Sequence, residues 1–262
     1  MTLQARGMPG GIPRPQMRDD MFAIALRAGL ALAFAVASIA ALAHEARPYK
    51  PPADTPGGSS AAYAFPLPEP GSYQLPPIKP AAGGRVLDEK GRARDLAELL
   101  RGRIAILAFI YTRCGDICPA ANLQLSLLQD LAAKEPKVAG LMRLLSMSFD
   151  PEYDTPAVMA EQAEIWRSQE REAPEWRFLT APDRMALTPV LAAYSQSIGP
   201  KPDKNSPTGP LYHIFRAFLI DRSGRIRNIY SLDFLDPRLV LTDIKTLLLE
   251  EEKLKRRHGF AR

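Results

Sequence analysis

The only two cysteines of this chain, Cys114 and Cys118, lie four residues apart and are the residues best suited to chemistry. The apolar run 104–111 leads into the first thiol, and Pro119, a residue favoured in the first turn of a helix, follows the second. Thiols at a helix start ionise readily, because backbone amides and the helix dipole stabilise the thiolate. A thiolate is both the nucleophile of disulfide exchange and a soft metal ligand. The motif therefore indicates copper capture or disulfide exchange.

The same spacing also permits a disulfide between the two cysteines. Residues four apart on a helix are neighbours, with Cα atoms about 6 Å apart, which is within the range of a disulfide. A structural disulfide is thus an alternative interpretation in an oxidising compartment. A bridge that closes so short a loop restricts the unfolded chain little, which argues against it. Arg113, directly before Cys114, is expected to add a positive charge that favours the thiolate.

His213 is the third candidate ligand. It follows the proline-rich loop 200–210 and precedes a predicted strand, and in sheets of this kind functional groups gather near strand ends. Two thiolates and one imidazole form a soft, low-coordinate set suited to Cu(I), whereas a closed structural zinc site needs a fourth ligand. A lone histidine is more often structural than a ligand. The other two histidines, His44 and His258, fall outside the predicted core, which favours His213 as the ligand.

Two aspartates are predicted to lie around these ligands without binding the metal. Asp116, between the thiols, is expected to cap the helix that follows, and its charge would resist thiolate formation. Asp150 ends the second buried strand and is expected near the same place.

Apolar runs and helical stripes alternate along the rest of the chain. This order predicts an α/β, thioredoxin-like fold, with a central mixed sheet flanked by helices. The continuous apolar run 104–111 is typical of a strand buried on both faces, and 141–149 is predicted as a second buried strand. The predicted strands are 85–88, 104–111, 141–149, 176–179, 214–221 and 225–230, and the predicted helices are 96–101, 119–135, 156–171, 182–195 and 237–252.

The front of the chain predicts export. An uncharged apolar run, 28–43, follows basic residues and ends in Ala-Leu-Ala, the layout of a signal peptide. It is shorter than the roughly 20 residues of a membrane span, but extension back to Met21 would permit an uncleaved anchor. We expect a periplasmic protein, or one anchored to the outer face of the cytoplasmic membrane. The predicted parts are an export signal or anchor (1–43), a proline-rich tether (44–82), the folded domain (83–252) and a basic tail (253–262).

Composition narrows the function classes. The chain is 46% hydrophobic and 24% charged, which is typical of a globular protein. Much of its net charge of +5 comes from basic residues near the two ends, without interleaved aromatic residues. Nucleic-acid binding is therefore not expected.

Three segments in this order resemble the Sco/SenC family of copper proteins of cytochrome oxidase assembly. Residues 112–119 read Thr-x-Cys-x-Asp-x-Cys-Pro, and residues 150–155 read Asp-Pro-x-x-Asp-Thr. His213 heads a segment that ends in Leu-Ile-Asp at Asp221. The resemblance covers roughly residues 83 to 250. Three departures are Gly115, where the family usually has proline, Ile214, where a small hydroxyl residue is common, and the unusually proline-rich loop before His213. They leave the copper set intact and the identity of the partner open.

The resemblance implies a thioredoxin-like fold with copper bound by Cys114, Cys118 and His213. We expect this copper as Cu(I), Cu(II) or both. The resemblance also implies delivery of copper to a copper-accepting protein, a cytochrome oxidase copper subunit in the first instance, or reduction of that subunit's cysteines. We therefore predict an exported copper-binding metallochaperone. The alternatives are a thiol–disulfide oxidoreductase that uses the cysteines as its redox pair, and a redox or copper sensor. Three residues between the thiols, rather than the usual two, argue against the first alternative.

Overall fold

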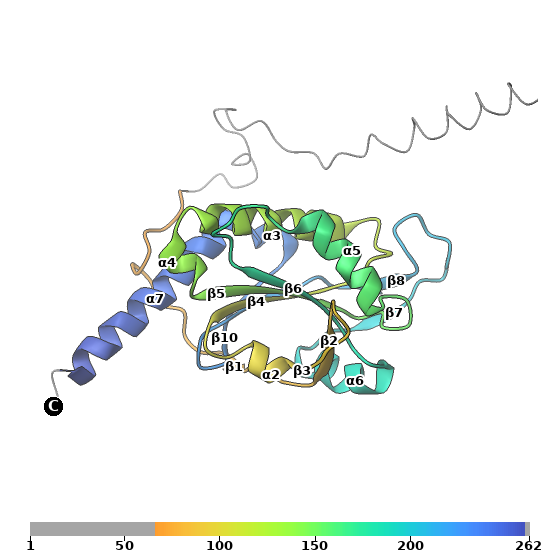
Figure 1. The fold of residues 1–262 in the computed structure, drawn as a ribbon, viewed down its shortest axis with the longest axis horizontal. Helices are drawn as coiled ribbons and strands as arrows, with labels where there is room; N and C mark the ends of the chain where they lie inside the picture. Colours follow the sequence, from red (N-terminus) through yellow and green to blue (C-terminus); the bar gives the residue numbers. More distant parts are fainter. Residues whose placement is uncertain (1–65, 260–262) are drawn as a thin grey trace, which may run out of the picture. The chain divides into compact units, whose positions relative to one another are not determined.

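The computed structural model describes residues 66–259, and a mixed eight-stranded sheet forms the centre of this part (Figure 1). β4, β5 and β6 run parallel, and the remaining pairings of this sheet are antiparallel. The predicted mixed sheet is thereby confirmed. In sheet order the strands are β1 (Lys79–Pro80), β10 (Arg225–Tyr230), β9 (Ala217–Ile220), β4 (Ile104–Ile110), β5 (Met142–Ser148), β6 (Glu175–Thr180), β2 (Arg85–Asp88) and β3 (Ala93–Asp95).

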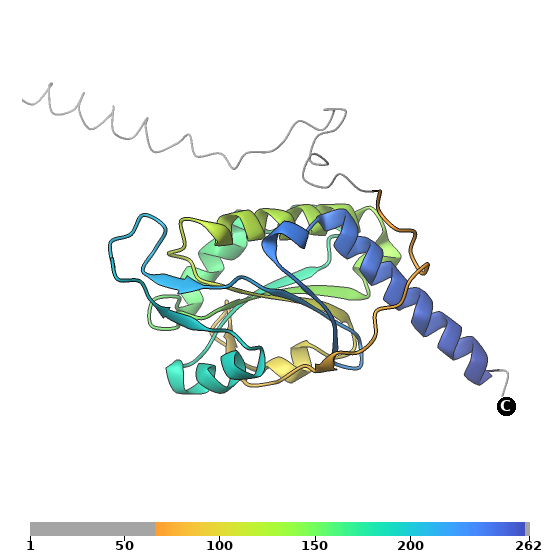
Figure 2. The same ribbon diagram turned by 180° about the vertical axis from the view of Figure 1, so that it is seen from behind.

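Helices cover both faces of this sheet. In Figure 1, α3 (Ile117–Ala133) and α5 (Pro156–Trp166) lie on one side, while α2 (Leu96–Leu99) and α6 (Arg184–Ala193) lie on the other. α7 (Pro237–Gly259) packs along α3, as the reverse view in Figure 2 also shows. Two short helices, α4 (Pro136–Ala139) and the 3₁₀ helix η2 (Leu232–Phe234), complete the set. Within residues 66–259, no helix is both long and apolar enough to cross a membrane.

The cysteine motif lies at the carboxyl end of β4, a central strand of the sheet. All seven residues of β4 are buried, because helices cover both faces, and this explains the unbroken apolar run. The chain leaves β4 at Tyr111, which is 2% exposed, and enters α3 six residues later. Both cysteines therefore lie at the carboxyl end of a buried parallel strand.

The region around His213 differs from the single strand predicted over 214–221. His213 ends a short strand, β8 (Leu211–His213), which pairs with β7 (Ile198–Pro200) in a separate two-stranded sheet. The chain then enters β9 in the main sheet. Apolar residues lie on both sides of the break, with Arg216 alone between them, so the sequence pattern gave little sign that the first residues leave the sheet.

Two helix ends also differ from the prediction. α5 stops at Trp166 rather than near residue 171, because Arg167 is extended and its guanidinium donates to the Trp176 carbonyl at 2.7 Å. α7 continues to Gly259, through the residues predicted as the start of a basic tail.

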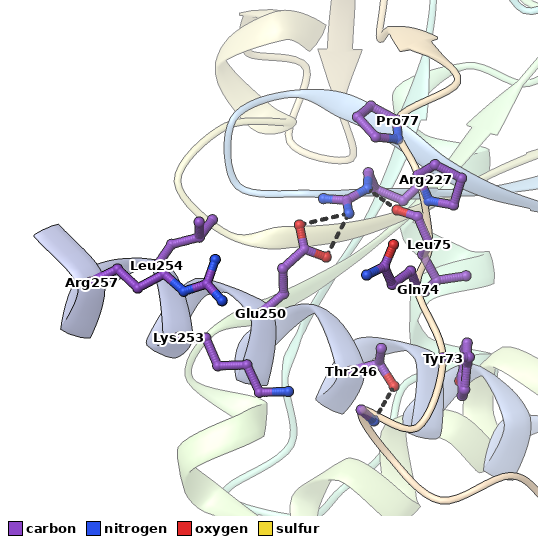
Figure 3. Close-up of a pocket in the computed structure, with 12 residues that line it drawn as sticks. Tyr73, Gln74, Leu75, Pro77, Arg227, Thr246, Glu250, Lys253, Leu254 and Arg257 are labelled. Atoms are coloured by element: carbon purple, nitrogen blue, oxygen red, sulfur yellow. Dashed lines mark hydrogen bonds and ion pairs between the residues drawn. The ribbon is translucent and has the colours of Figure 1, made fainter.

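Residues 69–80, predicted as part of the tether, pack against β10 and α7. The Gly71 amide donates to Thr246 at 3.0 Å, and β1 pairs with β10. Arg227, only 9% exposed, bonds to the Leu75 carbonyl and forms an ion pair with Glu250 (Figure 3). A cavity of about 450 Å³ lies between these segments, and neither cysteine nor His213 lines it. The predicted export segment and the tether up to residue 65 lie outside the described residues.

Candidate metal site

Cys114 and Cys118 lie together at the start of α3, and both are free, buried thiols. The Cys118 amide donates to the Cys114 sulfur at 3.3 Å, and the amides of Asp116 and Ile117 also point to that sulfur. The Cys114 sulfur therefore occupies the acceptor position at the helix start, where unpaired amides need a partner. The alternative structural disulfide is not formed in this structure.

The two thiols share one proton unequally. A hydrogen bond from the Cys118 thiol, helped by the helix amides, lowers the pKa of Cys114 to about 6 despite its burial. The pKa of Cys118 is raised, because Cys118 donates that hydrogen bond and lies buried next to a negative charge. At neutral pH the pair therefore presents one thiolate and one thiol.

This asymmetry predicts selective alkylation of the reduced protein. Since only a thiolate reacts, Cys114 should react with iodoacetamide with a midpoint near pH 6, while Cys118 stays unmodified up to about pH 8. Peptide mass spectrometry across a pH series measures both rates. Cys118→Ala removes the largest cause of the shift and should move the Cys114 midpoint upwards. A Cys114 midpoint of about 8.5 in the parent protein, the value of an ordinary thiol, would contradict the shared proton.

Asp150 lies beside the motif, as predicted, and engages the residue before Cys114. It is 3% exposed and accepts from the Arg113 guanidinium at 2.6 and 3.1 Å. The guanidinium also lies over the Tyr153 ring, 4.4 Å from its centroid. Arg113 is thus paired with Asp150. The pKa of Cys114 is lowered by the Cys118 thiol and the helix amides.

The expectation that the Asp116 side chain caps α3 is wrong. Asp116 occupies the cap position with its backbone, but its exposed side chain makes no capping hydrogen bond. The physical reason is that the Cys114 sulfur already accepts the amides that a capping carboxylate would take.

Asp154 is a site residue to which the sequence assigned no role of its own. It is completely buried and accepts from the Thr112 amide at 3.1 Å and from the hydroxyls of Thr112 and Ser148. It therefore joins the end of β5 to the first residue of the cysteine motif. Burial raises its pKa in spite of these hydrogen bonds. Its place in the Asp-Pro-x-x-Asp-Thr segment was the available signal.

His213 is half-buried, with its ring against Phe149 at 4.5 Å between centroids. The imidazole interacts with the Phe109 backbone, while its Nε2 is buried and has no hydrogen-bond partner among the described residues. Burial lowers the pKa of His213 to about 4, so the ring is neutral at physiological pH. A neutral imidazole with a free nitrogen is the form that binds a metal.

Tyr111 links the imidazole to the thiols. Its ring lies edge-on to the His213 ring at 6.5 Å. Burial, followed by the charge on Cys114, raises the pKa of Tyr111 to about 12. Across residues 66–257, no three His, Cys, Asp or Glu side chains are gathered closely enough to hold a metal. His213 and the two thiols are therefore neighbours of one tyrosine without forming a ready ligand set, and their role as a joint copper site stays a prediction.

The sequence matches a known family model, and the fold is similar to several solved structures. The family model of SCO1/SenC matches residues 85–249. The solved structure of Arabidopsis thaliana ScoI with copper bound is similar at 19% identity, with 65% of this chain and 98% of that chain covered and a TM-score of 0.56. Bradyrhizobium japonicum ScoI with copper bound is similar at 25% identity, with 64% and 98% covered and a TM-score of 0.53.

A third structure is that of BsSco, a Sco-family cytochrome c oxidase assembly protein in which a disulfide switch was identified. It is 23% identical, with 66% of this chain and 95% of that chain covered and a TM-score of 0.52. A search of curated proteins finds no match. The structural likenesses confirm the predicted thioredoxin-like fold. Because the family model spans well over half of the sequence, this chain belongs to the SCO1/SenC family.

Proposed function

We propose that this protein is an exported copper-binding metallochaperone. It binds Cu(I) through Cys114, Cys118 and His213 and passes copper to a copper-accepting protein, with a cytochrome oxidase copper subunit as the first candidate. Relatives with copper bound and the oxidase-assembly role of BsSco support this proposal. Export rests on the apolar run 28–43 and the basic residues before it.

The strongest support for the proposal is the chemistry of the three candidate ligands. A thiolate, a thiol and a neutral imidazole lie around the end of β4, and the imidazole Nε2 is buried without a partner. An unpaired buried polar atom costs about 1–3 kcal/mol, a cost that a metal–nitrogen bond would remove. Two sulfurs and one nitrogen favour Cu(I) over harder ions. Since the three groups are not gathered in this structure, binding requires the β8 segment and the motif to approach each other.

Copper analysis of the reduced protein tests the proposal. The parent should retain about one Cu(I) per chain after gel filtration against a weak chelator, because thiolates bind this ion strongly. The variant Cys114→Ser with Cys118→Ser should retain none, while its unfolding temperature changes little. The control pair Ser223→Ala with Ser231→Ala, which leaves both thiols and the loop before His213 in place, should bind copper as the parent does. Full copper retention by the double cysteine variant would reject the metal site.

A thiol–disulfide oxidoreductase is the second candidate, favoured by the lowered pKa of Cys114 and the adjacent Cys118 thiol. Attack by the Cys114 thiolate on a disulfide would form a mixed disulfide and release one target thiolate. Cys118 would then displace the second target thiolate, which leaves Cys114–Cys118 oxidised and the target reduced. Turnover on a disulfide substrate that survives His213→Ala would support this activity, because the histidine takes no part in it.

A further inference from the structure

The loop before β8, the strand that carries His213, lies against the cysteine motif at two glycines. We define the covering loop as residues 201–210, between β7 and β8; Figure 2 shows it extending from the end of the β7–β8 pair. A Cβ added to Gly115, between the thiols, would collide with the Pro207 carbonyl of this loop. A Cβ added to Gly209 would collide with the Arg113 carbonyl and the Tyr111 hydroxyl. The two backbones thus approach more closely than side chains would allow.

The covering loop is also braced internally. The Lys201 ammonium donates to the Thr208 hydroxyl at 2.6 Å and to its carbonyl at 3.1 Å, and the Gly209 amide donates to the Ser206 carbonyl at 2.8 Å. Gly209 has φ +88°, a conformation that other residues rarely adopt. Because these bonds hold the loop in one shape, a contact at one point positions the whole loop.

Tyr111 supplies a side-chain contact between the loop and the end of β4. Its hydroxyl donates to the Leu211 carbonyl at 2.9 Å and lies 3.3 Å from the Thr208 carbonyl. Leu211 precedes His213 by two residues on the same short strand. The Tyr111 ring contacts Phe149, on which the imidazole also rests. One tyrosine therefore fixes both the strand and the ring surface that orient His213.

From these contacts we propose that Tyr111 is a positioning residue for the His213 ligand. Its hydroxyl holds β8 and the covering loop beside the motif, which limits how far His213 must move to reach a copper ion bound by the thiols, and Gly115 and Gly209 permit this close packing. This inference rests on the proposed function. Tyr111 does not touch the metal; it acts through His213 by reducing the conformational freedom that His213 must lose on binding.

The test is a double-mutant cycle on Cu(I) affinity, measured by competition with a chromophoric chelator in reduced protein at pH 7.5. Tyr111→Phe keeps the ring and removes only the hydroxyl. It should weaken binding about five- to tenfold in the parent, the effect of one lost hydrogen bond, and less than about twofold in the His213→Ala background. A role confined to packing would lower affinity equally in both backgrounds.

Tyr194→Phe is the matched control. Tyr194 is a buried tyrosine whose hydroxyl also donates to a backbone carbonyl, that of Ala82, at 2.9 Å. It should leave Cu(I) affinity within about twofold of the parent in both backgrounds. Gly209→Ala, which forces the covering loop away from Arg113 and Tyr111, provides a second variant and should weaken binding at least as much as Tyr111→Phe. Thermal unfolding of each variant identifies loss of fold.

The outcomes separate this inference from the proposed function. If His213→Ala weakens binding but Tyr111→Phe does not, or does so equally in both backgrounds, the positioning role of Tyr111 is wrong and the ligand set stands. If His213→Ala itself binds copper like the parent, both the three-ligand site and the positioning role are rejected. A Tyr111 effect present only with His213 intact supports both.

Discussion

Replacing His213 by alanine is expected to lower the Cu(I) affinity of the reduced protein at least about 100-fold. Loss of a residue that hydrogen-bonds to a metal ligand lowers metal affinity about 10–100-fold, and loss of a ligand itself should lower it more. The neutral state of the imidazole makes this effect nearly independent of pH above about 5, since the pKa of His213 is lowered to about 4. Chelator competition at pH 5.5, 6.5 and 7.5 measures it.

The same series separates the histidine from the thiols. Affinity of the parent should fall more steeply with falling pH below about 6, because Cys114 is then protonated as well and two protons, rather than the one on Cys118, must leave when copper binds. The ratio of parent to His213→Ala affinity should stay constant over this range. His258→Ala, which alters a histidine near the end of the chain, is the control and should bind copper like the parent. A His213→Ala protein with parental affinity would remove the histidine from the site.

Asp154→Ala is expected to lower the free energy of unfolding by about 2–4 kcal/mol, because it leaves the Thr112 amide and the Ser148 hydroxyl without their buried acceptor. Urea denaturation followed by circular dichroism measures the change. Asp183→Ala is the matched control: it removes the cap of α6, where Asp183 accepts from the Ala186 amide at 2.7 Å, and should cost only about 1 kcal/mol.

The effect of Asp154→Ala should also depend on pH. Burial raises the folded-state pKa of Asp154 above its unfolded value, so its protonated form favours folding. That contribution is complete below the unfolded pKa near 3.8 and is lost as pH rises through the folded pKa. The difference in unfolding free energy between parent and Asp154→Ala should therefore shrink between pH 4 and pH 7. A difference that grows with pH would show that the carboxylate is stabilised rather than penalised by burial.

The parts of the site that depend on local sequence could be predicted. The buried strand, the helix start and the spacing of Cys114 and Cys118 lie within one short segment, and the structure has both thiols side by side there. Apolar periodicity likewise predicts the order of strands and helices, because it reflects which faces are covered.

The parts that depend on contacts between distant segments could not be predicted. Nothing near Asp116 indicates that a sulfur takes its capping role, since this follows from how the Cys114 side chain turns. The break between β8 and β9 depends on pairing with β7, some fifteen residues earlier in the chain. The contact of Gly115 with the Pro207 carbonyl joins segments more than ninety residues apart. The sequence shows that Gly115 replaces the usual proline of the family. It does not show that this glycine lets the loop around Pro207 pack against the motif.

X-ray absorption at the copper edge of Cu(I)-loaded protein tests the central claim most directly, namely that two thiolates and a distant imidazole hold one ion together. We expect a first shell of two sulfurs and one nitrogen, with the outer-shell scattering typical of imidazole. In His213→Ala that imidazole scattering should disappear while both sulfurs remain. A parent spectrum with sulfur ligands alone, unchanged in His213→Ala, would contradict the three-ligand copper site.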